Sequence, residues 1–135
     1  MIPPFNELGY LPPGIYPATL DEIDARFGQL SELRRVQMES VRWLIPLAKA
    51  SGVQRIILNG GFISDIMEPD DVDCVLLIGP GYPADPKAGE ELKAGLPFMD
   101  ISIARQSEFD WFVERGFGTD RDMVPKGVVE VIQWT

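Results

Sequence analysis

The sequence predicts an α/β (α+β) domain with a mixed β-sheet and helices packed mainly on one face. Four short apolar segments that suit strands alternate with segments of helical period along the 135 residues. We expect the strands at about 55–58, 72–78, 97–104 and 128–132. The length fits a single domain covering residues 1–135, and neither a linker nor an internal repeat divides it.

Capping residues and glycines mark the two N-terminal helices. Thr19 and Glu22 have the spacing of a capping box, and Gly28 is expected to end the first helix. A longer helix is predicted from about Ser31 to Ala50, with Gly52 just beyond its end. The apolar stripe of this longer helix is predicted to contain Leu33, Val36, Leu44 and Leu47, with Val41 and Ala48 beside them.

Three arginines of the longer helix lie off its apolar stripe: Arg34, Arg35 and Arg42. We expect them on a solvated face, paired with Glu32 or Glu39. Shorter helices are predicted at about 86–94 and 107–115.

Residues 1–18 are expected to form an extended arm. They contain two proline pairs, Gly9 and Gly14, with aromatic residues scattered between them. Such a segment is typically a strap packed across the domain by its aromatic side chains. A partner-binding segment is the alternative.

Composition excludes several classes of function. With a formal net charge of -9, long nucleic acid is an unsuitable partner, because phosphate contacts require clustered Lys and Arg. The chain has no histidine, which removes Ser-His-Asp and Cys-His nucleophilic sites and His-type zinc sites. Cys74 is the single cysteine, so no intramolecular disulfide can form. Without a signal peptide or long apolar span, we expect a cytoplasmic protein with no membrane association.

Asp71 and Asp73 are the most informative residues. They stand at the head of a strongly apolar strand and, because side chains alternate along a strand, they point to one face. Adjacent carboxylates repel each other unless a cation lies between them. Asp100, in the middle of the next predicted strand, adds a third carboxylate. Oxygen ligands of this kind suit Mg²⁺ or Mn²⁺.

A glycine pair precedes these aspartates. Gly60 and Gly61 follow the first predicted strand, and a glycine turn there allows backbone N–H groups to approach a phosphate. A metal held by Asp71 and Asp73 would bridge that phosphate, and Asp100 could hold a second metal or act as a base. These are the components of phosphoryl or nucleotidyl transfer.

The motif resembles the signature of the DNA polymerase beta-like nucleotidyltransferase superfamily. That signature is a hydrophobic residue, Gly, then Gly or Ser, about nine to thirteen residues, and Asp-hydrophobic-(Asp or Glu). Gly60-Gly61, nine residues and Asp71-Val72-Asp73 match it, and Asp100 matches the third carboxylate. Leu11 to Gly14 and Arg121 to Gly127 also look similar to a set of small bacterial proteins with this core.

The resemblance implies a minimal nucleotidyltransferase core that binds Mg²⁺ (or Mn²⁺) and a nucleoside triphosphate. Asp71, Asp73 and Asp100 would be catalytic residues and metal ligands, and Gly60, Gly61 and Ser64 would contact phosphate. Some small relatives act as antitoxins, modifying or masking a toxin. Larger members add a helical domain, and without one a partner chain or a homodimer is expected to complete the site.

The connector between the glycines and the aspartates departs from the superfamily, because it contains no Lys or Arg near the expected phosphates. Arg105, Arg121 or Lys126 could supply that charge from elsewhere.

Two hypotheses follow. The first is a metal-dependent nucleotidyltransferase that moves a nucleotide to a hydroxyl of a protein or small molecule. The second is a weakly active or inactive binding protein on the same fold, which masks a partner toxin or the product of a neighbouring gene.

Overall fold

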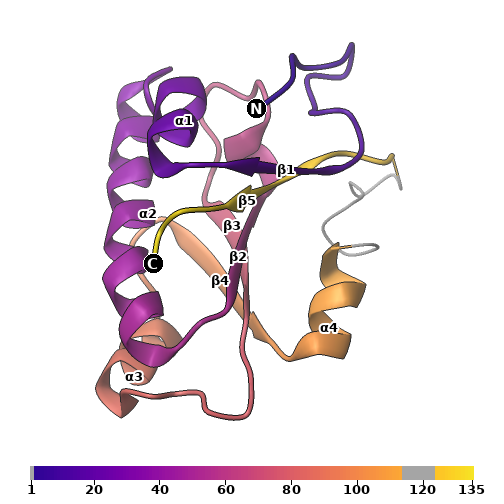
Figure 1. The fold of residues 1–135 in the computed structure, drawn as a ribbon. Helices are drawn as coiled ribbons and strands as arrows, with labels where there is room; N and C mark the ends of the chain where they lie inside the picture. Colours follow the sequence, from indigo (N-terminus) through magenta and orange to yellow (C-terminus); the bar gives the residue numbers. More distant parts are fainter. Residues whose placement is uncertain (1, 114–123) are drawn as a thin grey trace.

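A computed structural model describes residues 2–113 and 124–135 and contains a five-stranded mixed sheet. The strands are β1 (Ile15–Ala18), β2 (Arg55–Asn59), β3 (Val72–Leu77), β4 (Met99–Ala104) and β5 (Val128–Val131). They lie in the order β1-β5-β2-β3-β4 (Figure 1). The pairs β1–β5 and β3–β4 are parallel, and the two pairs made by β2 are antiparallel. The predicted mixed sheet is confirmed.

Helices lie on both faces of this sheet, most of them on one. They are α1 (Leu20–Ile23), α2 (Glu32–Ser51), α3 (Pro86–Ala94) and α4 (Gln106–Trp111). In Figure 1, α1, α2 and α3 lie on one side of the sheet and α4 on the other. A π-helical turn (Asp24–Gly28) follows α1, and a 3-10 turn (Gly60–Ile63) follows β2.

The ends of the first two helices follow the predicted chemistry. The Thr19 hydroxyl accepts from the Glu22 N–H at 3.2 Å, and the Glu22 carboxylate accepts from the Thr19 N–H at 3.0 Å, so the capping box is confirmed. Ser31 caps α2, and Gly52 ends it in the left-handed conformation. α4 begins at Gln106, one residue before the predicted start, and the predicted end of that helix at Arg115 lies outside the described residues.

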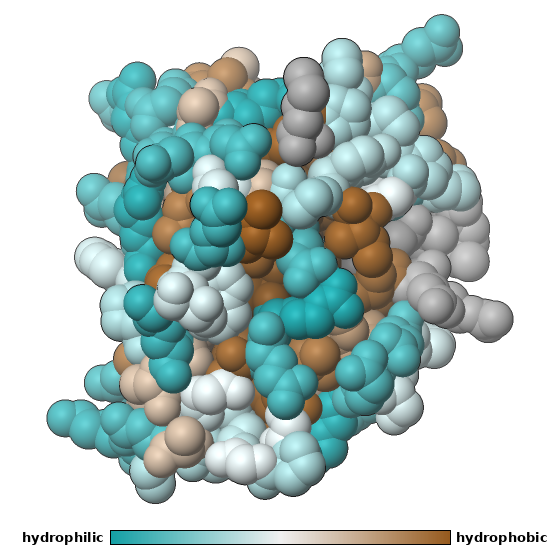
Figure 2. Space-filling model, viewed as in Figure 1, coloured by the Kyte–Doolittle hydropathy of each residue, from teal (hydrophilic) through white to brown (hydrophobic). Residues whose placement is uncertain are grey.

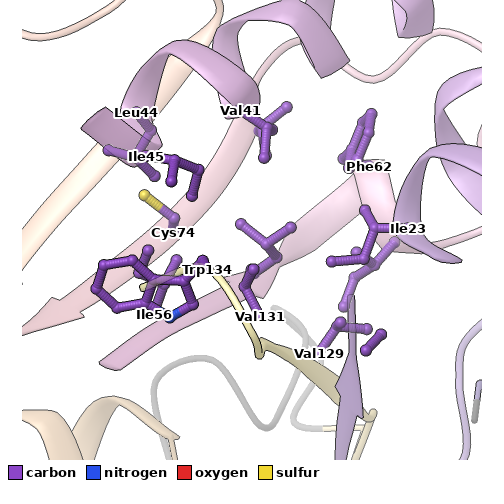
Figure 3. Packing of buried hydrophobic residues seen from close by; sticks show 14 of the residues in the cluster. Ile23, Val41, Leu44, Ile45, Ile56, Phe62, Cys74, Val129, Val131 and Trp134 are labelled. Atoms are coloured by element: carbon purple, nitrogen blue, oxygen red, sulfur yellow. The ribbon is translucent and has the colours of Figure 1, made fainter. Parts of the chain in front are cut away.

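The hydrophobic core has two layers, one on each face of the sheet. The larger layer lies between the sheet and α2 and contains Cys74, which Figure 3 shows among its neighbours. The smaller layer lies between the sheet and α4 and consists of Ile57, Val75, Leu77, Ala104, Phe109 and Val128. In the view of Figure 2, apolar atoms are visible in the middle of the molecule, and hydrophilic side chains cover much of the surrounding surface.

Side chains alternate along β3, so the core layer in which a residue packs shows which face of the sheet it points to. Val72, Cys74 and Leu76 belong to the larger layer, whereas Val75 and Leu77 belong to the smaller one. Asp73 therefore shares the α4 face, opposite to Cys74 as predicted. Burial raises the pKa of the Cys74 thiol, which keeps it protonated.

Four sequence-based expectations need correction. Arg42 pairs with Asp21 at 3.4 Å and Asp24 at 3.0 Å, not with Glu32 or Glu39. Arg34 is completely buried rather than solvated, because it binds backbone carbonyls of the segment that follows β2. Val36 is 42% exposed instead of lying in the core stripe, since the stripe that faces the sheet runs through Met38, Val41 and Leu44. The arm of residues 1–18 is not extended coil throughout, because its last four residues pair with β5 as β1.

Within the described part of the chain, no helix is both long and apolar enough to cross a membrane.

Candidate functional site

The carboxylates predicted at the site meet at one end of the sheet. Asp73 pairs in register with Asn59 of β2 on one side and with Asp100 of β4 on the other. Residues in register on neighbouring strands point to the same face, so all three side chains share the α4 face of the sheet. Asp71 lies two residues before Asp73, just ahead of β3. The structure thus brings Asp73 and Asp100 to neighbouring positions at one end of the sheet, with Asp71 just ahead of β3.

Burial and neighbouring charges act together on Asp73. They raise its pKa to about 6, with loss of hydration as the largest cause, followed by the negative charge of Asp100. Asp71 contributes in the same direction, and the Lys126 ammonium opposes both. A half-buried carboxylate beside two others is therefore costly to ionise when no cation is bound.

Gly60 fixes how closely the chain approaches Asp73. Its φ is +78°, and a Cβ atom at this position would lie 2.1 Å from Asp73 Oδ2. No residue with a side chain fits both that conformation and that space. Gly61 differs, because its φ is ordinary and the nearest contact of an added Cβ is Pro69 Cβ at 3.1 Å.

Asn59 adds an oxygen that is buried without a partner. Its side chain is 4% exposed, and its Oδ1 makes no hydrogen bond. A buried amide oxygen normally has a partner, so an unpaired one beside Asp73 suits a bound ligand or cation. Sequence reasoning missed Asn59, although an Asn that ends an apolar strand immediately before two glycines was a usable signal.

Ser64, predicted to contact phosphate, has its hydroxyl engaged within the turn. Its Oγ donates to the Gly61 carbonyl at 2.8 Å and accepts from the Ile66 N–H at 3.3 Å. With 3% exposure it braces the backbone after Gly61.

The buried role of Arg34 is the main feature that the sequence analysis missed. Its guanidinium donates to the Phe62 carbonyl at 2.6 Å, the Ser64 carbonyl at 2.9 Å and the Gly61 carbonyl at 3.1 Å. Further acceptors are the carbonyls of Phe27, Ile66 and Met67. The connector, defined here as residues 61–70, therefore receives its positive charge from α2. Burial lowers the pKa of Arg34, and the charge of Asp65 counters that effect.

Two further side chains hold the same connector, that of Gln37 in α2 and that of Ser31, the N-cap of α2. Gln37 Nε2 donates to the Pro69 carbonyl at 2.6 Å, and Ser31 Oγ donates to the Met67 carbonyl at 3.2 Å. Ser31, Arg34 and Gln37 are spaced three residues apart, so they lie on one side of the helix. The acidic side chains of Asp65, Glu68 and Asp70 are exposed, as expected for a solvated acidic loop.

The N-terminal arm contacts the connector and the segment before β5. The Asp65 N–H donates to the Gly9 carbonyl at 3.0 Å, and the Gly127 N–H donates to the Leu11 carbonyl at 2.8 Å. Lys126 Nζ lies 5.9 Å from the centre of the Tyr10 ring. The arm thus connects the two segments that flank the glycine turn, which favours the predicted strap.

Three cations were candidates for a phosphate. Arg105 Nη1 donates to the Gly79 carbonyl at 3.3 Å, beyond the C-terminal end of β3 and therefore far from Asp73. Arg121 lies outside the described residues. Lys126 is the candidate whose charge acts on Asp73.

The donor set fits a hard divalent cation, because carboxylates and an amide oxygen are the ligands that Mg²⁺ and Mn²⁺ prefer. Within residues 2–113 and 124–135, no group of three or more His, Cys, Asp or Glu side chains is gathered closely enough to hold a metal as it stands. Metal binding would therefore need side-chain rotation of the exposed Asp71 and Asp100 toward Asp73.

Comparison with known families gives a match that spans the whole site. A family described as DUF6932, family of unknown function, matches residues 3–132. The chain belongs to the DUF6932 family. The DUF6932 match includes all five strands, the connector and the three aspartates. Comparisons with curated proteins and with solved structures gave no significant match.

Proposed function

We propose that this DUF6932 protein is a metal-dependent nucleotidyltransferase that moves a nucleotide from a nucleoside triphosphate to a hydroxyl of a protein or small molecule and releases pyrophosphate. The observation that carries the proposal is the placement of Asp73 between Asn59 and Asp100, against a glycine with no room for a side chain. The resemblance of Gly60-Gly61 and Asp71-Val72-Asp73 to the DNA polymerase beta-like superfamily supports it.

Asp71, Asp73 and Asp100 would hold Mg²⁺ or Mn²⁺. The metal, when bound, would neutralise phosphate charge and polarise the phosphorus under attack. Asp73 is the most buried of the three aspartates and lies at their centre, which favours it as a metal ligand. Asp100 is exposed at the edge strand, where it can accept the proton of an incoming hydroxyl.

The glycine turn would receive the phosphates. Gly60 brings the backbone against Asp73, so a phosphate at the turn lies beside the carboxylate end of the site. Lys126, which acts on Asp73 from the segment before β5, supports the binding of an anionic ligand there.

Substitution of the aspartates tests the proposal. We expect Asp71→Asn and Asp73→Asn each to reduce nucleotide transfer by at least about a hundredfold, because each removes a metal ligand, while the fold is kept. Transfer is measured with each labelled nucleoside triphosphate and Mg²⁺ or Mn²⁺, with and without the product of the adjacent gene. Asp70→Asn, an exposed carboxylate in the same connector, is the matched control and should retain activity. Full activity of Asp73→Asn contradicts the proposal.

A binding protein on the same fold is the second candidate. The exposed carboxylates of the connector and the net charge of -9 favour it, because together they suit a basic partner such as a toxin. In this case an Asp71→Ala/Asp73→Ala double variant still binds or neutralises the product of the adjacent gene. Loss of both binding and nucleotide transfer in the double variant favours the enzyme.

A further inference from the structure

Arg34 is a buried cation whose described hydrogen-bond acceptors are all backbone carbonyl oxygens. Five of the six residues that provide these carbonyls lie between Gly61 and Met67. A guanidinium carries five N–H donors in a planar fork, which allows one side chain to serve several carbonyls at once. Arg34 therefore fixes the backbone of most of the connector from a single point on α2.

The connector joins the two halves of the candidate site. Its N-terminal end adjoins Gly60, which lies against Asp73, and its C-terminal end leads directly into Asp71. Displacement of the connector would thus move the glycine turn and Asp71 relative to Asp73. Arg34 itself is fully enclosed and does not reach a ligand.

We propose that Arg34 is a positioning residue for the nucleotide site, which holds the connector so that the glycine turn and Asp71 together receive a metal–nucleoside triphosphate. The inference rests on the proposed function, since it assigns a role within that same site. It also accounts for a connector without Lys or Arg: the positive charge enters from α2 and acts on the backbone.

Arg34→Lys tests this role, because it keeps the charge but replaces the fork by a shorter-reaching point donor. Arg35→Lys is the matched control: the same change one residue along α2, at an exposed position. For each protein, the Kd of the preferred Mg²⁺–nucleoside triphosphate is measured by calorimetry. Amide hydrogen exchange is followed over residues 61–67, and thermal unfolding confirms that the protein is folded at the assay temperature.

For Arg34→Lys we expect faster exchange in the connector and a Kd at least about tenfold higher, with β3 and β4 still protected. With the acceptor found in the transfer assay, KM for the nucleotide should rise more than kcat falls, because the carboxylates on β3 and β4 stay in place. Arg35→Lys should leave all of these quantities unchanged.

Unchanged Kd and KM in a folded Arg34→Lys whose connector exchanges faster would overturn the inference. If Arg34→Lys does not fold, Gln37→Met carries the test, since it releases only the Pro69 carbonyl. A Kd raised about threefold supports the inference, and an unchanged Kd with faster exchange overturns it. If the unmodified protein binds no nucleotide, the proposed function fails first and this role fails with it.

Discussion

Gly60 combines a left-handed backbone conformation with a close approach to Asp73. We predict that Gly60→Ala destabilises the fold by at least about 2 kcal/mol, because a left-handed Ala costs about 1–2 kcal/mol and its Cβ would lie 2.1 Å from Asp73 Oδ2. The overlap also displaces Asp73, so nucleotide binding should be lost. Urea unfolding and nucleotide titration measure the two effects.

Gly81→Ala is the control for this prediction. An added Cβ at Gly81 meets nothing within 4 Å, and its φ lies outside the left-handed region. We expect a change within about 0.5 kcal/mol. Equal stability of the Gly60→Ala and Gly81→Ala proteins would show that the turn at Gly60 is not as tight as described.

The raised pKa of Asp73 predicts a specific pH dependence of stability. Its pKa of about 6 in the folded state lies above the ordinary aspartate value of 3.8, so the folded state holds the proton more tightly than the unfolded state. Without metal, this contribution to stability is fully present below about pH 4 and is lost as pH rises to about 6. Asp73→Asn removes this titrating group. As pH rises through this window, the variant should therefore become more stable relative to the unmodified protein, by about 1–3 kcal/mol.

Urea unfolding of both proteins at several pH values between 4 and 7 checks the prediction. Parallel stability curves would mean that Asp73 ionises in the fold as easily as in the unfolded chain. At pH 7, Mg²⁺ should reduce the difference in stability between Asp73→Asn and the unmodified protein, because a cation between the carboxylates favours their charged forms.

Arg34 shows where prediction from sequence fails at the residue scale. An arginine outside an apolar stripe is normally solvated, because burying a charge is costly unless hydrogen bonds compensate for it. Apart from the carbonyl of Phe27, the compensating carbonyls belong to residues that follow Arg34 by 27 to 33 positions in the sequence. Every residue has a backbone carbonyl whatever its side chain, so no sequence pattern could reveal which carbonyls bind Arg34. The position of Asp73 on the face opposite to Cys74 was predictable, because strand alternation is a local rule.

At the scale of elements, α4 is held to the sheet chiefly by Phe109. This side chain is 1% exposed and packs in the smaller core layer. The Arg55 guanidinium lies 5.0 Å from the centre of its ring, and Arg55 also pairs with Glu130 at 2.7 Å. We predict that Phe109→Ala destabilises the protein by about 3–5 kcal/mol, as expected for a large buried aromatic.

Trp111→Ala on the same helix is the comparison, because Trp111 is 55% exposed. It should cost less than about 1 kcal/mol in urea unfolding. Similar losses for the two variants would mean that α4 contributes to stability by its helix alone and not by its contact with the sheet.

Elements with strong local signals were predicted well. The structure places α3 at Pro86–Ala94, the range expected from Pro86 near its start and Gly95 beyond its end. β1 was missed because its four residues include Pro17 and lie in a proline-rich arm, where nothing local indicates pairing. Its partner is β5, more than a hundred residues away in the chain. Such pairings depend on the assembled sheet, which a single sequence does not reveal.

At the scale of the whole molecule, the site draws on most of the chain. The arm provides Gly9 and Leu11, α2 provides Arg34, and β2 leads into Gly60. Asp73 and Asp100 lie on β3 and β4. The core on the α2 face is continuous, whereas the α4 face is apolar near Phe109 and carboxylate-bearing at the other end.

The position of β5 between β1 and β2 has a consequence for the order in which the molecule can form. A ribosome releases the N-terminal residues first, yet β1 has β5 as its sheet neighbour and β2 lacks one of its two neighbours until β5 arrives. The sheet, and with it the strap across the glycine turn, is complete only after residue 131 has been synthesised. A nascent chain halted before that point presents an open edge on β2, so the sheet can close only after β5 has been synthesised.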